Sequence, residues 1–403
     1  MVSTMKKILF LTGTRADYGK LKGLIKAVEE SPDFEAYVYV CGMHLLERFG
    51  GTYREVLKDE YDNTYVALGL SQSSASSASV SLGDTVRAFS SYVDSVKPDM
   101  IVVHGDRMDA LAGAVVGALT NVLVAHVEGG ELSGTIDESI RHAISKFAHV
   151  HLACNEDARR RLLQLGEDDE RIFVIGSADV DLMLDDNLPT LEKAKARYGI
   201  PFANYGILMY HPVTTEVKNA EANARAVIDA VIESGRDFVV IYPNSDLGYE
   251  AILSEYKRLL SCERFRIFPS LRFEYFLSLL KGADLILGNS SAGVRESGVY
   301  GIPAIDIGTR QKGRYSTDEC GNIQHVGYDA NEIIDAIVAS GEYAVKAFAY
   351  GKGNSVRGFM RVLESEAVWS LSTQKQFNDR CLEGDADAQR KEGSGAHSCE
   401  GWK

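Results

Sequence analysis

The chain has 403 residues, of which 45% are apolar and 25% charged, and this balance excludes collagen-like, disordered and disulfide-scaffold proteins. Its 57 acidic and 43 basic residues give a net charge of −14, so we expect no nucleic-acid partner. The six cysteines form no CxxC pair, which argues against a zinc knuckle. Neither a membrane-spanning apolar run nor a signal-peptide core is visible, so we expect a cytoplasmic protein without a membrane partner.

The first part of the chain alternates short apolar runs with amphipathic segments, which is typical of a doubly wound parallel sheet. Residues 8–11 predict a buried strand and residues 12–18 a polar loop, after which apolar residues recur at helical spacing. Further strands are expected at 37–40, 100–103, 122–125, 150–153 and 172–175, with helices at about 83–96, 109–119, 138–148 and 156–165. A serine-rich stretch at 71–81 interrupts this pattern and predicts a mobile loop.

A second alternating set follows a connection at about 177–204, which we expect to be less ordered. Its strands are predicted at 207–210, 238–242, 265–268, 284–287 and 303–306. The fold class is therefore α/β, with two Rossmann-like doubly wound domains over residues 1–176 and 177–352 and an active-site cleft between them. A helix over 353–371 is expected to pack back toward the first domain. Residues 372–403 are too poor in large apolar side chains to be ordered.

Ligands of doubly wound domains bind beyond the carboxyl ends of the strands, so the polar residues there are the candidates for function. Arg15 follows the first strand and is either a phosphate ligand or an exposed loop arginine. Asp106 and Arg107 follow the strand at 100–103. They are either an acid/base group and a phosphate contact, or a mutual salt bridge.

Two more carboxylates follow the next strand, namely Glu128, beside two glycines, and Asp137, at the start of a helix. With Asp106 they can form a cluster of three carboxylates in one cleft. Repulsion in such a cluster separates pKa values and permits one acid and one base. The alternative is that acidic residues simply stabilise the start of a helix.

The second domain offers candidates of the opposite charge. His211 ends the strand at 207–210 and is either a phosphate or proton-transfer group or a hydrogen-bonded loop histidine. Ser290 and Ser291 open a helix where free N–H groups and the helix dipole favour an anion, although serine is also an ordinary helix cap. Glu296 could accept hydrogen bonds from ribose hydroxyls. Arg310, in a basic loop, suits a phosphate ligand or is merely solvated.

Seven segments between residues 5 and 370 together resemble one enzyme family, the hydrolysing UDP-N-acetylglucosamine 2-epimerases, and above all the branch that makes N-acetylmannosamine for sialic acid synthesis. In chain order they are GTRADYGK, VHGDRMDAL, HVEGGELSGTIDESIRHAISK, YHPVTTE, FPSLRFEYF, GNSSAGVRE and GTRQKGR. The resemblance implies a GT-B fold with UDP in the interdomain cleft. It also implies elimination of UDP to a 2-acetamidoglucal, hydration with inversion at C2, and a homodimer or homotetramer. Neither a metal nor a nicotinamide cofactor is expected.

The resemblance also assigns roles to individual residues. It makes Asp106, Glu128 and Asp137 the catalytic acids and matches His211 to the histidine of the family's His-Pro motif. Nucleotide or phosphate contacts are expected from Arg15, Arg107, Asn244, Ser290, Ser291, Glu296 and Arg310. Two alternatives stay open: the same reaction on UDP-N,N'-diacetylbacillosamine or GDP-N-acetylglucosamine, and a GT-B glycosyltransferase that requires an acceptor glycan.

Overall fold

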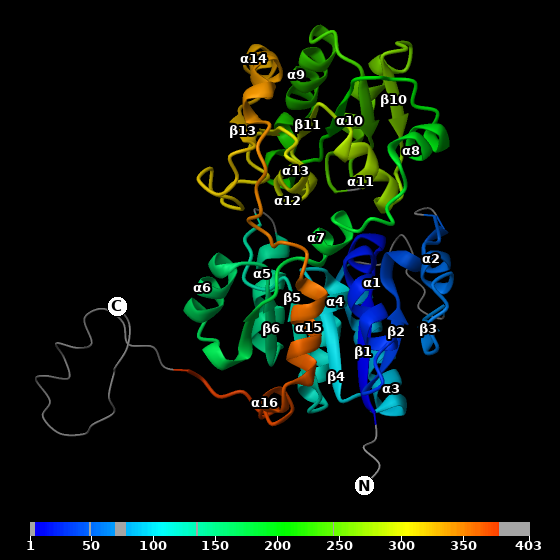
Figure 1. Cartoon of the computed structure of the whole chain (residues 1–403), viewed down its shortest axis with the longest axis vertical. Coiled ribbons are helices and arrows are strands. Elements are labelled where there is room, and N and C mark those ends of the chain that lie inside the picture. Colours follow the sequence, from blue (N-terminus) through cyan, green and yellow to red (C-terminus); the bar gives the residue numbers. More distant parts are fainter. Residues whose placement is uncertain (1–4, 48–49, 69–77, 134–135, 245, 379–403) are drawn as a thin grey trace, which may run out of the picture.

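Two parallel β-sheets, one above the other along the long axis of the molecule, organise the computed structural model (Figure 1). It describes residues 5–47, 50–68, 78–133, 136–244 and 246–378. We call each sheet with the helices packed on it a domain. Both sheets are flanked by helices, as the alternating sequence pattern predicts, and the fold class of two Rossmann-like domains is confirmed.

The N-terminal domain carries a seven-stranded sheet. Its elements are β1 (Lys6–Thr12), α1 (Arg15–Glu29), β2 (Phe34–Val40), α2 (Tyr53–Leu57), β3 (Thr64–Val66), α3 (Ala78–Val96), β4 (Met100–His104), α4 (Met108–Leu119), β5 (Leu123–Val127), α5 (Ile136–Phe147), β6 (Val150–Ala153), α6 (Glu156–Gln164) and β7 (Ile172–Val174). The strand order is β3-β2-β1-β4-β5-β6-β7, and every pair is parallel. The order reverses between β1 and β4, which is where such sheets open a crevice for ligands.

The C-terminal domain carries a six-stranded parallel sheet of order β10-β9-β8-β11-β12-β13, which reverses between β8 and β11. Its elements are α7 (Ala178–Met183), α8 (Leu191–Tyr198), β8 (Gly206–Met209), α9 (Ala220–Glu233), β9 (Phe238–Ile241), α10 (Tyr249–Tyr256), β10 (Phe265–Phe268), α11 (Phe273–Lys281), β11 (Leu285–Gly288), α12 (Ser291–Arg295), α13 (Ser297–Tyr300), β12 (Ala304–Ile307), β13 (Ile323–Val326) and α14 (Ala330–Ala339). Two helices follow, α15 (Ser355–Glu364) and α16 (Glu366–Trp369).

The strands of the N-terminal domain are buried on both faces, which explains their continuous apolar runs. Ile8 and Phe10 of β1 belong to the core on one side of the sheet, together with α1 and α15. Leu9 and Leu11 face the opposite core, to which α3 and α4 contribute. If every second residue of β1 were polar, one of these two cores would therefore have polar side chains facing it.

The chain crosses between the domains twice, and the two crossings touch. The Ser177 N–H donates a hydrogen bond of 2.7 Å to the Tyr350 carbonyl. Beside it, Gly176 and Gly351 have φ of 84° and 123°. A Cβ on Gly351 would lie 3.0 Å from the Cα of Gly176, so this close approach requires glycine.

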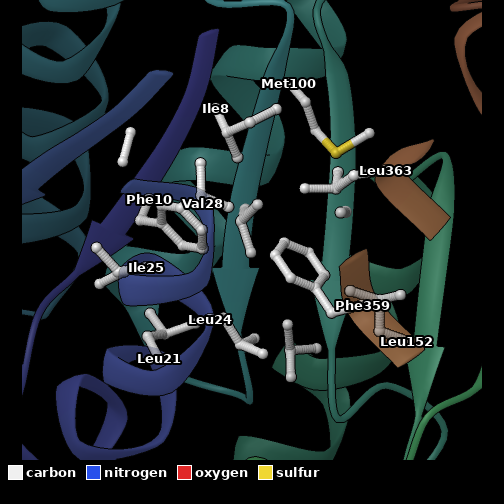
Figure 2. Close-up of a cluster of buried hydrophobic side chains, with 14 of the residues drawn as sticks. Ile8, Phe10, Leu21, Leu24, Ile25, Val28, Met100, Leu152, Phe359 and Leu363 are labelled. Carbon is white, nitrogen blue, oxygen red and sulfur yellow. The ribbon is translucent and has the colours of Figure 1, made fainter. Parts of the chain in front are cut away.

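After the second crossing, α15 packs on the N-terminal domain, where it lies beside the central strands (Figure 1). Phe359 and Leu363 are fully buried in the core of that domain. The Phe359 ring lies 6.1 Å from the ring of Phe10, and Figure 2 shows both rings among Ile8, Met100 and Leu152.

Three sequence-based predictions of irregular structure are wrong in part. The loop expected at 12–18 gives way to α1 at Arg15, because Thr14 and Asp17 form a capping box that starts the helix early. Residues 78–81 of the serine-rich stretch are the first turn of α3, whereas 71–77 lie outside the described residues. The connection at 177–204 contains α7 and α8.

Further differences concern the chain end and the edge strands. Residues 372–378, expected to be disordered, are held by contacts such as those of Lys375 with Glu167 and with the Ala148 carbonyl. The edge strands β3 and β13 were not predicted, because both are partly exposed and their polar residues, Thr64 in β3 and Gln324 with His325 in β13, leave no continuous apolar run. None of the helices in the described ranges has the length and apolar character needed to cross a membrane.

The packing of α15 yields a prediction on stability. We expect Phe359→Ala to destabilise the N-terminal domain by about 3–5 kcal/mol, because it leaves a cavity in a closed core. Denaturant unfolding of the variant measures this loss. The control is Phe377→Ala, since Phe377 is 85% exposed and its removal should change little. Equal effects of the two substitutions would contradict a structural role for α15.

Candidate active site

The candidate site lies where the carboxyl ends of the two sheets meet. Contacts across this boundary include Arg295 of α12 with Glu128 after β5, and Arg15 of α1 with the Leu271 carbonyl. A cavity of about 190 Å³ also opens between the domains, with Glu131 on one side and Arg314 on the other. The predicted interdomain position of the polar residues is therefore what the structure shows.

Glu128 has an unusual backbone for its residue type. Its φ is 64°, in the left-handed region, and its side chain is buried. The Glu128 N–H donates to the Leu152 carbonyl at 3.0 Å, and Arg141 donates to the Glu128 carbonyl at 2.8 Å. A non-glycine residue in this region costs about 1–3 kcal/mol and typically persists at functional sites, where its surroundings fix it.

The Glu128 carboxylate is surrounded by donors. Its Oε2 lies 3.1 Å from His104 Nε2 and 3.2 Å from Lys20 Nζ. Its Oε1 accepts hydrogen bonds from Ser177 Oγ at 2.9 Å and from Arg295. Burial by itself would raise the pKa of Glu128, but the charges of Arg295 and Lys20 lower it well below the usual range. This carboxylate is therefore ionised at neutral pH.

Asp106, at the end of β4, pairs with Arg141, the same arginine that contacts the Glu128 carbonyl. Burial opposes its ionisation, but Arg141, Arg107 and further cations lower the pKa of Asp106. The expectation that mutual repulsion would separate the pKa values is thus wrong for Asp106 and Glu128, whose pKa values are both lowered. Each carboxylate has its own cations, Arg141 for Asp106 and Arg295 with Lys20 for Glu128.

Asp137 stands on the first turn of α5 and is half-buried. Burial disfavours the charged form of Arg107, but Asp137 and Asp106 raise the pKa of Arg107. Arg107 immediately precedes α4. Asp137 therefore belongs to the same edge of the sheet, in the electrostatic neighbourhood of Arg107 and Arg310.

On the opposite side, His211 is fixed in one protonation state. Its Nδ1 accepts a hydrogen bond of 3.0 Å from the Asn244 N–H, and burial lowers the pKa of His211 to about 3, with the nearby Arg310 adding to the effect. The imidazole is consequently neutral and carries its proton on Nε2. Asn289 holds the His211 backbone on both sides, with bonds of 2.7 Å and 2.9 Å.

The segment after β11 differs from its prediction in one respect. Ser290 caps α12 through a bond from the Ala292 N–H, and Ser291 is half-buried beside it. The helix is only five residues long, so it supplies a much smaller dipole than the sequence pattern suggests. Arg310 donates to the Asn289 carbonyl at 3.2 Å, which brings a cation to this segment.

Glu296 is a buried carboxyl on the boundary between α12 and α13. Burial and the charge of Asp179 raise the pKa of Glu296 to about 7, although Lys20 and Arg295 oppose the shift. Its Oε2 has no hydrogen-bond partner. The group is therefore able to receive a donor from a ligand.

Arg15 is not on a loop, since it is the first residue of α1. Its guanidinium reaches the Leu271 carbonyl of the other domain and lies 3.5 Å from Glu55. It thus bridges the domain boundary at a distance from the Glu128 cluster.

Several buried or half-buried residues of the site were not singled out from the sequence. Asp109, in the first turn of α4, has a pKa raised to about 6 by burial and by Asp17, and it packs so closely on Gly13 that a Cβ there would lie 2.2 Å from its Oδ2. Lys20, Glu131 and Arg295 form ion pairs around Glu128. All four residues stand inside the quoted motifs, but a sequence does not show which charged side chains are buried.

The potential ligand atoms of Glu128, Glu131 and Cys154 lie within 4.8 Å of one another, as at a metal site. Arg295 donates to all three residues and lies among them. The positive charge that this group of residues requires is therefore supplied by a guanidinium.

Comparison with known proteins places the chain in a family. The family model described as UDP-N-acetylglucosamine 2-epimerase matches residues 26–364. A UDP-N-acetylglucosamine 2-epimerase of Neisseria meningitidis serogroup B is 47% identical over 93% of this chain and 99% of its own. A UDP-N,N'-diacetylbacillosamine 2-epimerase (hydrolyzing) of Legionella pneumophila is 33% identical over 81% of this chain and 87% of its own.

Among solved structures, the UDP-GlcNAc 2-epimerase from Neisseria meningitidis bound to UDP-GlcNAc superimposes with a TM-score of 0.76. The match covers 89% of this chain and 99% of that one at 19% identity, and it therefore supports the GT-B fold alone. The fold follows from this likeness, and the family from the sequence matches. The chain belongs to the UDP-N-acetylglucosamine 2-epimerase family.

Proposed function

We propose that this protein is a hydrolysing 2-epimerase that converts UDP-N-acetylglucosamine and water to UDP and N-acetylmannosamine, the sugar from which sialic acids are built. The observation that carries the proposal is the arrangement of charge across the domain boundary. Ionised carboxylates follow the strands of one sheet, and cations with a neutral histidine follow those of the other. The Legionella relative is named as a hydrolysing enzyme, which supports hydrolysis as the outcome.

In this proposal UDP binds mainly to the C-terminal domain. Arg310 contacts phosphate together with Ser290 and Ser291, and His211 donates a hydrogen bond from Nε2. Glu296 receives the ribose hydroxyls, for which its unpartnered oxygen is suited. Further contacts to the nucleotide come from Asn244, Arg15 and Arg107.

The first step is an elimination. A carboxylate takes the C2 proton, the C2–H electron pair forms the C1=C2 double bond, and the C1–O bond breaks to release UDP. We assign the proton removal to Asp106, because its side chain is 21% exposed while that of Glu128 is 5% exposed and already accepts hydrogen bonds from Lys20, Ser177 and Arg295. Cations that stabilise the departing diphosphate make the removal of a weakly acidic proton feasible.

The second step is the hydration of the 2-acetamidoglucal. A proton is added to C2 from the face opposite to the one that lost it, and water adds to C1, which gives N-acetylmannosamine. Glu128 and Asp137 are the other two proposed catalytic carboxylates, and we assign them to this half of the reaction. The whole sequence consumes one water and leaves the protein unchanged.

A second substrate is supported by a specific finding. The Legionella relative is named for UDP-N,N'-diacetylbacillosamine, which differs from UDP-N-acetylglucosamine at sugar positions distant from the reacting C1 and C2. The chemistry proposed here would proceed unchanged on that sugar.

Turnover in D₂O tests the reaction. We expect ¹H NMR of the protein with UDP-N-acetylglucosamine to show UDP and N-acetylmannosamine without a C2 proton, because the glucal takes deuterium from the solvent. Formation of UDP-N-acetylmannosamine without free UDP would contradict hydrolysis. Turnover of UDP-N,N'-diacetylbacillosamine alone would identify the second substrate.

The three proposed carboxylates give a mutational prediction. We expect Asp106→Asn, Glu128→Gln and Asp137→Asn each to lower kcat by about 10²–10⁴, the usual range for acid–base groups. The Kd for UDP should stay within about threefold, since these residues face the sugar. Asp229→Asn on α9, which pairs with Arg258 away from the site, is the control. A variant with nearly full kcat would remove its residue from the mechanism.

The raised pKa of Glu296 predicts a pH dependence of stability. Its pKa of about 7 exceeds the ordinary value of 4.5, so the folded protein binds more protons between these pH values. The contribution of Glu296 to stability is thus complete below about pH 4.5 and is lost as the pH rises toward 7. We expect Glu296→Gln to show a smaller fall in Tm than the wild type between about pH 5 and 8. Glu221→Gln, at an exposed position on α9, should behave as the wild type does.

A further inference from the structure

We propose that Arg295 is a positioning residue that holds the Glu128 carboxylate in its working orientation and keeps it ionised, with Glu131 as its counter-charge. The proposal rests on the function proposed above, in which Glu128 is a catalytic carboxylate. Arg295 itself stands on α12 of the other domain, so the group that orients Glu128 is supplied across the domain boundary.

The geometry of Arg295 is that of a fixed clamp. Its side chain is 4% exposed. Nη1 donates to both oxygens of Glu131, at 2.8 Å and 2.7 Å, while Nη2 donates to Glu128 and, at 2.7 Å, to Ser177 Oγ. The guanidinium also lies 4.7 Å from the centre of the Tyr350 ring. A planar group with several donors in a rigid fork can satisfy these acceptors at once, which an ammonium cannot.

Other charged and titratable groups also face Glu128, and they come from every element around it. They are Lys20 of α1, His104 of β4, Arg141 of α5, Asp179 of α7, Cys154 after β6, Glu131 after β5, and Arg295 and Glu296 of α12 and its C-terminal end. Lys20 is shared, since it also lies 2.9 Å from Asp179. Arg295 is also shared, with Glu131, but among the cations it has the largest effect on the charge of Glu128.

Because Arg295 lies between two carboxylates, the direction in which each substitution should shift the pKa of Glu128 can be stated. Glu128 is stabilised in its ionised form by Arg295 and destabilised in it by Glu131. Removal of the Arg295 charge should raise the pKa of Glu128, and removal of the Glu131 charge should lower it. A residue that merely filled space at this position would produce neither shift.

The orientation argument is separate from the charge argument. Without Arg295, Oε1 of Glu128 keeps the Ser177 hydroxyl at 2.9 Å and the Lys20 ammonium at 3.3 Å, and neither is a planar fork. The carboxylate is then held less firmly, and small displacements of a reacting group are costly in rate. Lysine at 295 would keep the charge and lose the fork, so it separates the two effects.

The test uses the full-length protein and the variants Arg295→Gln, Arg295→Lys and Arg295→Gln/Glu131→Gln, with Arg225→Gln as a matched control at an exposed arginine of α9. The ionisation of Glu128 is followed by ¹³C NMR of protein labelled at the glutamate carboxyl carbons. Glu128→Gln identifies the signal by its loss. Circular dichroism and Tm establish that each variant is folded.

We expect the Glu128 signal of the wild type and of Arg295→Lys to stay ionised down to about pH 4, near the ordinary midpoint of glutamate. In Arg295→Gln its midpoint should rise by at least about one pH unit. The double variant should show a lower midpoint than Arg295→Gln, because the repulsion from Glu131 is gone. In turnover, both single variants should lose about tenfold or more in kcat with KM within about threefold, since the clamp acts on Glu128 and not on the nucleotide.

A folded Arg295→Gln protein whose Glu128 signal titrates as in the wild type would overturn the proposal, as would an unchanged kcat in both single variants. If Arg295→Gln does not fold, the lysine variant still tests the clamp through its kcat. The NMR titration needs no turnover, so it is informative even if the wild type does not act on UDP-N-acetylglucosamine. That last result would contradict the proposed function alone.

Discussion

A buried charge cluster at the domain boundary is the constraint on which the remaining structure depends. The charged side chain of Arg295 projects into the N-terminal domain, where it is buried. This burial is possible because Glu128 and Glu131 accept its hydrogen bonds and balance its charge. Burial of any one of these ions alone would be strongly unfavourable, since its lost hydration would have no replacement. The two domains must therefore approach in one register, the one in which all these charges find their partners.

This register also places the chemistry. Parallel sheets present the carboxyl ends of all their strands at one edge, and here the two edges face each other. Residues far apart in the chain, such as Asp106 and His211, thereby belong to a single region, in which the proposed catalytic carboxylates follow one sheet and His211 with Arg310 follows the other. Such an arrangement suits a substrate with a sugar to deprotonate at one end and a diphosphate to stabilise at the other.

The sequence was sufficient to predict most strands of the two sheets and the sheet edge at which the site lies. Runs such as residues 8–11 and 207–210 are wholly apolar because both faces of their strands are covered, and this leaves a pattern that a sequence displays. The short edge strands β3 and β13 leave no such pattern. The early start of α1 depends on the reciprocal hydrogen bonds of a capping box between Thr14 and Asp17. Polar residues of this kind are equally common in loops, and the segment was therefore predicted as a loop.

For the site, residue types and positions at strand ends were predictable, whereas protonation states were not. The amino-acid sequence does not distinguish Glu296, whose pKa is raised, from Glu128, whose pKa is lowered. The difference lies in which cations reach each carboxylate through space. The expectation that repulsion would separate the pKa values of the acids was wrong for Asp106 and Glu128, because Arg141 lowers the one and Arg295 the other.

The packing of α15 on the N-terminal domain has a consequence for folding during synthesis. The core of the N-terminal domain is closed by Phe359 and Leu363, which leave the ribosome only after the entire C-terminal domain has been made. The half that is translated first is therefore completed last and carries an open apolar surface while the second half folds. The N-terminal domain is therefore synthesised first, but its core is closed only after the C-terminal domain has been synthesised.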